Sequence, residues 1–281
     1  MPELPEVENV RLSLLPLIQG KTITAIGTNW EKILTGGLAH FQQTLVGHTV
    51  TGLDRRGKYL LFRFDHGVTM VSHLRMEGKY QVVPYPTVPF GRFAHVWFTF
   101  SDDSQLRYHD MRKFGRMQLI ATGQEHTVSG LASLGPEPTP AQFDLAAFAA
   151  KLKARKAPIK SVLLDQTVVA GVGNIYADET LWQARVNPQQ PACTLKKTEI
   201  AALHDAIIAV LAQSIQLGGT SVHTFVDATG ARGGFQDRLH VYERQGEPCD
   251  RCGTAIVKIK VGQRGTHYCP KCQPLRKRVI R

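Results

Sequence analysis

The sequence predicts an α+β protein of more than one domain: an N-terminal helix with an antiparallel β-sandwich, then a helical domain with a four-cysteine hairpin. Three observations support this prediction. The chain has 281 residues, which is about twice the usual domain length. Its hydrophobic period changes from strand-like to helical beyond a proline-rich segment at 135–140. Four of its five cysteines form two C-x2-C pairs near the end of the sequence.

The composition is that of a chain that folds around a core. Hydrophobic residues make up 43% and charged residues 20%, which excludes a disordered chain. We find no apolar run approaching the roughly 18 residues that span a bilayer, and the first six residues are acidic and proline-rich. We therefore expect no signal peptide, no membrane partner and a cytoplasmic location.

The first element is predicted to be a helix. Val7, Val10 and Leu14 give it an apolar stripe. Pro5 is tolerated in a first helical turn, whereas Pro16 is expected to stop or kink the helix.

Short β-rich runs follow up to about residue 122. Runs 59–64 and 68–74 flank one turn signal, and runs 96–100 and 106–108 flank another, so both pairs are predicted to be hairpins. Long helices do not alternate with these strands, which favours an antiparallel sandwich over a doubly wound sheet.

The segment Gly135-Pro136-Glu137-Pro138-Thr139-Pro140 cannot continue a helix or a strand and is the best candidate for a linker. Helices are predicted beyond it, and Gly218-Gly219 should end the last of them. A mobile loop is expected at 220–234. The predicted helices are 141–154, 159–164, 175–184 and 198–217. The predicted division is residues 1–134, a linker at 135–140, a helical domain at 141–240 and a zinc hairpin with a basic tail at 241–281.

The spacing of Cys249, Cys252, Cys269 and Cys272 suits one zinc ion. Each C-x2-C pair turns two sulfurs toward one point, and the 16 intervening residues can bring the pairs together as a hairpin. Two disulfides are the alternative, disfavoured in a cytosolic chain. Four protein ligands leave no position for water, so the zinc is expected to be structural. Cys193 is expected to be an ordinary thiol.

Basic residues are concentrated at the end of the chain. The formal net charge is +11, and the last 33 residues contain nine basic residues and one acidic residue. A polyanion is the natural partner of such a segment. A solvated charged tail is the alternative interpretation.

Pro2 would become the amino terminus if the initiator Met1 were removed. Its secondary amine could attack an electrophilic carbon and form an iminium, which is covalent catalysis of the Schiff-base type. Glu3 and Glu6 lie beside it and suit proton transfer. The alternative is an acidic helix N-terminus stabilised by the helix dipole.

Several motifs that follow one another along the whole chain resemble one family. They are Met1-Pro2-Glu3-Leu4-Pro5-Glu6-Val7-Glu8, Arg56-Gly57-Lys58-Tyr59-Leu60, His73-Leu74-Arg75-Met76, Arg112-Lys113-Phe114-Gly115, Leu134-Gly135-Pro136-Glu137-Pro138, Gly171-Val172-Gly173-Asn174-Ile175-Tyr176 and the four-cysteine hairpin. In this order they closely resemble bacterial formamidopyrimidine-DNA glycosylases, which excise 8-oxoguanine and have lyase activity.

This resemblance implies a helix-two-turn-helix domain and four catalytic residues. Pro2 would be the nucleophile at C1′, and Glu3 the acid that protonates the opening sugar. Lys58 matches the lysine that donates a proton in β-elimination, and Arg264 matches the arginine of δ-elimination. Both cations can also hold a phosphate.

The resemblance also implies how DNA is held. Met76, Arg112 and Phe114 match the side chains that fill the gap left by an extruded nucleotide, with Arg112 facing the orphaned cytosine. The phosphate contacts would be Lys156, Lys160 and Asn174. The loop 220–234 would close over the everted base. A glycosylase must flip the nucleotide to reach C1′, and apolar wedges offset the cost of unstacking.

Each of these positions has an ordinary alternative. Met76 and Phe114 could be core residues, Arg112 a surface ion-pair partner and Lys58 a solvated strand residue. Arg264 could be one more charge of a basic hairpin.

The chain also departs from the family pattern. Phe93 stands where these proteins commonly have a DNA-contacting histidine, which leaves that contact in doubt, and the basic tail extends beyond the expected end.

We therefore predict a monomeric DNA glycosylase and AP lyase with one structural zinc ion. Its partner would be double-stranded DNA with oxidised bases, chiefly oxidised purines, or abasic sites. One alternative is the endonuclease VIII type, which prefers oxidised pyrimidines; Leu4 and the motif at 112–114 argue against it. The other is a zinc-dependent DNA-binding protein without catalysis.

Overall fold

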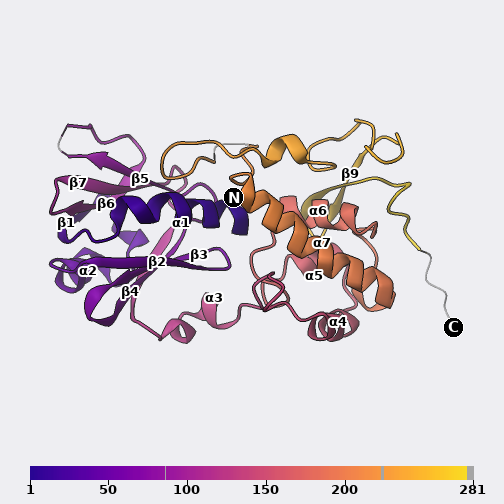
Figure 1. Cartoon of the computed structure of the whole chain (residues 1–281), viewed down its shortest axis with the longest axis horizontal. Helices are drawn as coiled ribbons and strands as arrows, with labels where there is room; N and C mark the ends of the chain where they lie inside the picture. Colours follow the sequence, from indigo (N-terminus) through magenta and orange to yellow (C-terminus); the bar gives the residue numbers. More distant parts are fainter. Residues whose placement is uncertain (86, 223–224, 277–281) are drawn as a thin grey trace. The chain divides into compact units, whose positions relative to one another are not determined.

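The computed structural model describes residues 1–85, 87–222 and 225–276, which form two compact units (Figure 1). The first unit comprises Met1–Ala132 and Ile215–Gln236, and the second comprises Ser133–Ser214 and the chain from Asp237 onward. Two residues of the expected capping loop, 223–224, and the basic tail at 277–281 lie outside the described residues.

The first unit contains an opening helix and two antiparallel sheets. The strand orders are β1-β6-β7-β5 and β2-β3-β4-β8. The elements are α1 Leu4–Ile18, β1 Ile23–Thr28, η1 Glu31–Ile33, α2 Gly37–Leu45, β2 Val50–Arg56, β3 Tyr59–Phe64, η2 Asp65–Gly67, β4 Val68–His73, β5 Lys79–Pro84, β6 Ala94–Phe100, β7 Ser104–His109, β8 Arg116–Ala121, η3 Glu125–Thr127 and α3 Ser129–Ala132.

Both predicted hairpins are confirmed. Strand β3 pairs antiparallel with β4, and β6 pairs antiparallel with β7. Helix α2 was not predicted from the sequence, because its short apolar pattern, with Phe41 and Leu45 buried, does not stand out from the neighbouring strands.

Helix α1 lies between the two groups of strands in the view of Figure 1. Val7, Val10 and Leu14 are buried in one core with residues of both sheets. Pro16 does not stop the helix at once: it lies inside the last turn, and the helix ends two residues later at Ile18. A proline near a helix end removes only one hydrogen bond, and the chain leaves the helix within the same turn.

The second unit is helical with a two-stranded hairpin. The four helices predicted from the period are present, each with ends within four residues of the expected ones. Its elements are α4 Leu145–Lys153, α5 Ile159–Leu163, α6 Asn174–Gln183, η4 Ala192–Thr194, α7 Lys197–Gln216, which ends in the first unit, β9 Val257–Val261 and β10 Arg264–Tyr268; the short η5 Phe235–Arg238 lies at the boundary.

Helix α7 differs from the expectation that no run of the sequence is long and apolar enough to span a bilayer. By length and composition alone, its 20 residues with a mean hydropathy of 1.3 would suffice to cross a membrane. Its apolar stripe, which includes Ile200, Leu203 and Ile207, is buried within the fold, as in the core helix of a globular protein.

The proline-rich segment at 135–140 is part of the second unit and is held within it by hydrogen bonds and close packing. Gly135 donates its N–H to the carbonyl of Gln166, and Pro136 accepts the N–H of Ala170. A Cβ at Gly135 would lie 2.7 Å from the carbonyl oxygen of Thr167. The division at 1–134, 135–140, 141–240 and 241–281 stays a prediction.

Candidate active site and zinc centre

The first turn of α1 is buried, together with the residues that precede it. Pro2 is buried, and Glu3 and Glu6 are 3% and 2% exposed. The carboxylate of Glu6 accepts the N–H of Glu3 at 2.8 Å through Oε2 and the N–H of Thr220 at 2.8 Å through Oε1. The carboxylate of Glu6 therefore ties the start of α1 to Thr220.

The described part of the segment 219–235 is anchored to α1 and to itself. Ala228 donates its N–H to the hydroxyl of Ser13 at 3.1 Å, and Gly219 accepts the N–H of Phe235 at 3.0 Å. These bonds, with the one from Thr220 to Glu6, place the start of the loop and its middle beside the opening helix.

Lys58 lies in the tight turn between β2 and β3 and is 6% exposed. The neighbouring Arg55 supports this turn by donating to the carbonyl of Gly57 at 3.0 Å and to Glu8 at 2.7 Å. Burial alone would raise the pKa of Glu8, but hydrogen bonds from Arg11 and Arg55 outweigh burial, so the pKa is lowered. Glu8 therefore stays ionised and fixes the arginine beside Lys58.

His73 was named from the sequence only as part of a motif. Its ring meets that of Tyr59 edge-on at 4.5 Å, and both line a cavity of about 220 Å³. Burial, then Arg75 and Lys58, lower the pKa of His73 to about 3. The side chain is therefore a neutral imidazole, whose Nδ1 accepts the N–H of Arg75 at 2.9 Å.

The predicted wedge residues lie on two loops of the first unit. Met76 follows β4, whereas Arg112 and Phe114 lie between β7 and β8. Phe114 is 49% exposed, and the guanidinium of Arg112 lies 5.1 Å from the centre of its ring. An exposed phenylalanine under an arginine is a poor core residue and is suited to insertion.

Tyr108 brings these two loops together. A Cβ at Gly78 would lie 2.2 Å from its hydroxyl, and one at Gly115 would lie 1.9 Å from it. Both glycines are therefore required by the close approach of the loops to one buried ring. The loop of Met76 and the loop of Phe114 therefore both pack against the side chain of Tyr108.

Asp110 holds the second loop and was missed from the sequence. Its carboxylate is 1% exposed and accepts the N–H groups of Arg112 at 3.1 Å and Gly115 at 2.7 Å. An aspartate that bonds to backbone amides two and five residues later is a turn device. The sequence signal that could have identified Asp110 is its position immediately before the turn that carries Arg112 and Phe114.

In the second unit, the three predicted phosphate contacts differ in exposure. Lys156 is exposed, and Asn174, at the start of α6, donates to the carbonyl of Gly265 at 3.1 Å. Lys160 is fully buried, and its Nζ bonds to Asp178 at 2.7 Å and to Gly265 and Thr266 at 2.8 Å each. The structure thus gives Lys160 protein partners around the hairpin that carries Arg264.

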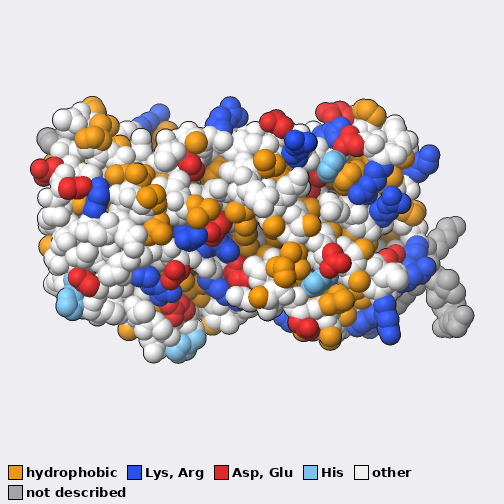
Figure 2. Space-filling view, viewed as in Figure 1, with side chains coloured by type: hydrophobic (Ala, Val, Ile, Leu, Met, Phe, Trp, Pro, Cys, Tyr) orange, Lys and Arg blue, Asp and Glu red, His pale blue; other side chains and the backbone are white. Residues whose placement is uncertain are grey.

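Arg264 is exposed and begins strand β10. The turn before it consists of Gly262 and Gln263, with φ of 52° and 65°. Two consecutive left-handed residues form the turn that suits a two-residue hairpin. Figure 2 shows Lys and Arg side chains gathered over this hairpin; the exposed ones include Arg251, Lys258, Lys260, Arg264 and Lys271.

The four cysteines near the end of the chain fit one zinc ion. All four sulfurs lie within 4.8 Å of one another, with 3.9 Å between Cys249 and Cys272 and 3.5 Å between Cys252 and Cys269. A tetrahedron with Zn–S bonds of about 2.3 Å has S···S edges of about 3.8 Å. A disulfide needs a bond of about 2 Å, and all four thiols are free. The alternative of two disulfides is therefore wrong.

The sandwich, the helical unit and the zinc hairpin are the three parts of the chain that match family models of DNA-repair glycosylases with a zinc finger. The chain belongs to the formamidopyrimidine-DNA glycosylase family. Residues 1–117 match the model of that enzyme's N-terminal domain, 134–226 match its H2TH domain, and 246–275 match the zinc finger found in FPG and IleRS.

Individual members of this family are similar to the chain over nearly its full length. A formamidopyrimidine-DNA glycosylase of Latilactobacillus sakei is 57% identical over 97% of this chain and 98% of its own length. Two solved structures of Lactococcus lactis Fpg, one with abasic-site DNA and one with DNA containing N7-benzyl-Fapy-dG, are each 44% identical with a TM-score of 0.92. They cover 97% of this chain and 99% and 100% of their own chains. The family makes this chain a DNA glycosylase with AP lyase activity.

Proposed function

We propose that this chain excises 8-oxoguanine and formamidopyrimidines from duplex DNA and then cleaves the strand. Once Met1 is removed, the secondary amine of Pro2 attacks C1′ of an everted nucleotide, and the damaged base leaves. The sugar ring opens to an iminium joined to Pro2. Loss of the C2′ proton then eliminates the 3′ phosphate, and a second elimination releases the 5′ phosphate.

The buried first turn of α1 supports this proposal more than any other observation. Pro2 and Glu3 are buried, and Glu6 bonds to both Glu3 and Thr220. A nucleophile must be held in a fixed geometry to gain from proximity. The bonds of Glu6 fix the backbone of Glu3 next to Pro2 and anchor the loop that the resemblance assigns to covering the lesion.

The other catalytic roles follow the matching motif positions. Glu3 protonates the sugar oxygen as the ring opens, because a carboxyl held next to the nucleophile is in position to act as a general acid. Lys58 assists β-elimination and Arg264 assists δ-elimination. Both are cations suited to stabilise a departing phosphate.

DNA is held by residues of both units in this proposal. Met76, Arg112 and Phe114 enter the space left by the flipped nucleotide, with Arg112 facing the orphaned cytosine. Lys156 and Asn174 contact phosphates. Lys160 belongs to the same set by resemblance, and its buried partners favour an action through the hairpin rather than at a phosphate. The solved Lactococcus lactis relatives, which hold abasic or Fapy-containing DNA, support DNA as the partner.

Borohydride trapping tests the chemistry. The purified protein is incubated with a duplex containing 8-oxoguanine opposite cytosine in the presence of borohydride, and a covalent adduct is expected. The control is the same protein with a short N-terminal extension, which converts the nitrogen of Pro2 to an amide and should abolish the adduct. Intact-mass measurement establishes the N-terminus of each sample.

A lesion panel tests the substrate class. Excision should be faster for 8-oxoguanine and formamidopyrimidine than for dihydrouracil. Preference for dihydrouracil would favour the endonuclease VIII type. A mobility shift with no reducible adduct would favour a binding protein without catalysis.

A further inference from the structure

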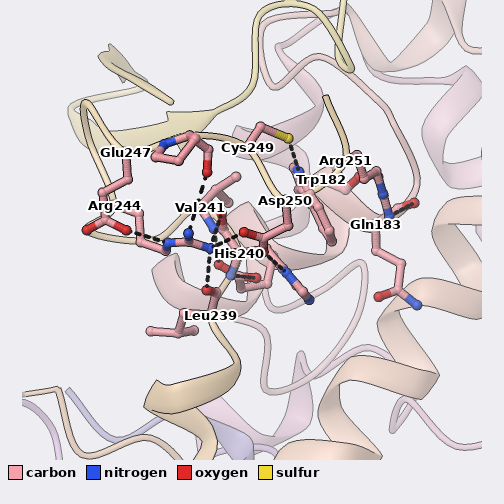
Figure 3. A network of polar contacts seen from close by, with 12 residues as sticks. Trp182, Gln183, Leu239, His240, Val241, Arg244, Glu247, Cys249, Asp250 and Arg251 are labelled. Atoms are coloured by element: carbon pink, nitrogen blue, oxygen red, sulfur yellow. Dashed lines mark hydrogen bonds and ion pairs between the residues drawn. The ribbon is translucent and has the colours of Figure 1, made fainter. Parts of the chain in front are cut away.

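The indole of Trp182 points at the zinc site. Its Nε1–H lies 3.4 Å from the sulfur of Cys249, and both side chains are almost fully buried, with exposed fractions of 4% and 2% (Figure 3). Indole offers one donor and no acceptor. A buried indole N–H normally has a hydrogen-bond partner. Among the described residues, the partner of this donor is the sulfur of Cys249.

The same indole also holds the loop between the first two cysteines. The guanidinium of Arg251 lies 3.6 Å from the centre of the Trp182 ring, and the ring of His240 stacks on Trp182 at 3.9 Å. Arg251 further donates to the carbonyl oxygens of Trp182 at 2.6 Å and Gln183 at 3.3 Å. The C-x2-C turn is thus fastened to the last turn of α6 (Figure 3).

Helix periodicity explains why Trp182 is in this position. Asn174, Asp178 and Trp182 are four residues apart and therefore share one face of α6. Asn174 bonds to the carbonyl of Gly265, and Asp178 accepts the N–H of His267 at 2.8 Å. One helical face contacts the hairpin strand with its first two residues and a zinc ligand with its third.

Charge gives the N–H···S bond its significance. Four thiolates around Zn²⁺ sum to a net charge of −2, and burying such a charge is costly unless donors or cations compensate it. Trp182 supplies a donor to one sulfur, and Arg251, which lies between Cys249 and Cys252 in the sequence, holds its cation over the same indole. A thiolate that accepts a hydrogen bond shares its lone pair and becomes a weaker nucleophile.

We propose that Trp182 is a positioning residue of the zinc centre, whose N–H···S bond slows zinc loss and protects the sulfur of Cys249 from electrophiles. This role goes beyond the glycosylase reaction. Its tests need no DNA, so failure of the proposed base excision would leave them intact.

Cadmium-113 NMR tests the bond in the unaltered sequence. Zinc is replaced by cadmium-113, and the indole Hε1 protons are observed. We expect a scalar coupling to cadmium for the indole of Trp182, transmitted through the sulfur of Cys249, and none for Trp30 or Trp97. Absence of that coupling in a cadmium-loaded, folded sample would overturn the proposal.

Trp182→Phe tests the consequence. Phenylalanine keeps an aromatic face for Arg251 and His240 but removes the donor. We expect zinc transfer to a chromogenic chelator to become about tenfold faster, in the range that outer hydrogen bonds of metal ligands usually contribute. Trp97→Phe, which also removes one tryptophan but in the β-sandwich, should release zinc at the wild-type rate.

The order of alkylation gives a second readout. During limited treatment with iodoacetamide, each thiolate displaces iodide, and peptide mass spectrometry counts the adducts at each cysteine. Cys269, which is also buried and accepts the N–H of Cys272 at its sulfur, is the internal reference. In Trp182→Phe, Cys249 should be modified earlier relative to Cys269 than in the wild type. Equal zinc release and the same order in both proteins, with unchanged circular dichroism, would refute the role of the indole.

Discussion

The Nζ atom of Lys160 lies 2.7 Å from Oδ1 of Asp178, and both side chains are fully buried. The pair joins α5 to α6. Lys160 also donates to the carbonyl of Gly265 and the hydroxyl of Thr266, and Asp178 accepts the N–H of His267. A charge pair between two short helices therefore fixes the strand that begins with Arg264.

The first prediction is that Lys160→Met destabilises the second unit. Methionine has a similar volume but leaves the carboxylate of Asp178 buried without its cation. Breaking a buried pair in this way typically costs about 3–5 kcal/mol. Urea unfolding should therefore show a clearly lower midpoint. Lys197→Met, at an exposed position of α7, should change the free energy of unfolding by less than about 0.5 kcal/mol.

Salt dependence separates this role from a phosphate contact. Each lost phosphate contact lowers the slope of log K against log salt by about 0.9 on duplex DNA. We expect Lys160→Met to leave the slope unchanged at a temperature where it is folded. A reduced slope with unchanged stability would instead assign Lys160 to the DNA backbone.

The sequence predicted well the features that are local along the chain. The cysteine spacing predicted the zinc site because two C-x2-C turns set the ligand geometry almost alone. Alternation and helical period predicted both hairpins and four helices. The motif order predicted the family, although the structure and comparisons leave the roles of Pro2, Lys58 and Arg264 as proposals.

The features that the sequence did not predict join distant residues. Glu6 and Thr220 are 214 positions apart, and the bond between them follows from how the chain returns to α1. Asp178 looks like any polar residue of a helix until α5 and β10 are packed against it. Lys160 was expected at a phosphate from the family resemblance, and the sequence did not show that its side chain is fully buried.

The second prediction concerns the nucleophile. Pro2→Gly keeps a free amine after removal of Met1 but loses the ring and the secondary amine. Single-turnover excision of 8-oxoguanine should fall by about 100-fold, because covalent catalysis depends on the amine that attacks C1′. Duplex affinity, measured by fluorescence anisotropy, should change by less than threefold. Equal losses of excision and affinity would contradict a nucleophilic role.

The third prediction concerns the loop of Arg112 and Phe114. Asp110→Asn replaces one of two buried acceptor oxygens with an NH2 group that would face a backbone N–H. We expect the loop to loosen and excision of 8-oxoguanine to slow about tenfold, since a lost charge-assisted bond costs roughly 1.5 kcal/mol. A 2-aminopurine beside the lesion should report less unstacking.

The matched control for that experiment is Asp103→Asn, in the exposed turn between β6 and β7. It removes the same charge without touching the loop of Arg112. If Asp103→Asn slowed excision as much as Asp110→Asn, the effect would come from net charge and not from the turn.

The fourth prediction is a pH dependence of stability from His73. Burial, with Arg75 and Lys58, lowers the pKa of this imidazole to about 3 in the folded chain, against about 6.5 in an unfolded one. Between these values the unfolded state binds more protons, so stability is complete above pH 6.5 and is lost as pH falls toward 3. The contribution lost by pH 4 should be about 1–3 kcal/mol, after allowance for partial solvation.

His73→Gln should remove this acid-sensitive contribution. The variant's urea midpoint should therefore fall less than that of the wild type between pH 6.5 and pH 4. The exposed His126 provides the comparison, and His126→Gln should follow the wild-type curve. Parallel curves for His73→Gln and the wild type would show that this imidazole is not held neutral by its surroundings.

The fifth prediction concerns the hairpin that presents Arg264. Arg264→Ala removes an exposed guanidinium at the first residue of β10, and we expect the yield of δ-elimination product to fall at least tenfold while zinc stays bound. Lys260→Ala removes an exposed charge from the paired strand, beside Gly265 in the register, and should weaken binding only through the salt-dependent charge effect.

Removal of zinc should reproduce the loss seen in Arg264→Ala, because a metal-free hairpin no longer holds its strands. Full product formation by a sample shown to be metal-free would mean that the finger does not place this arginine.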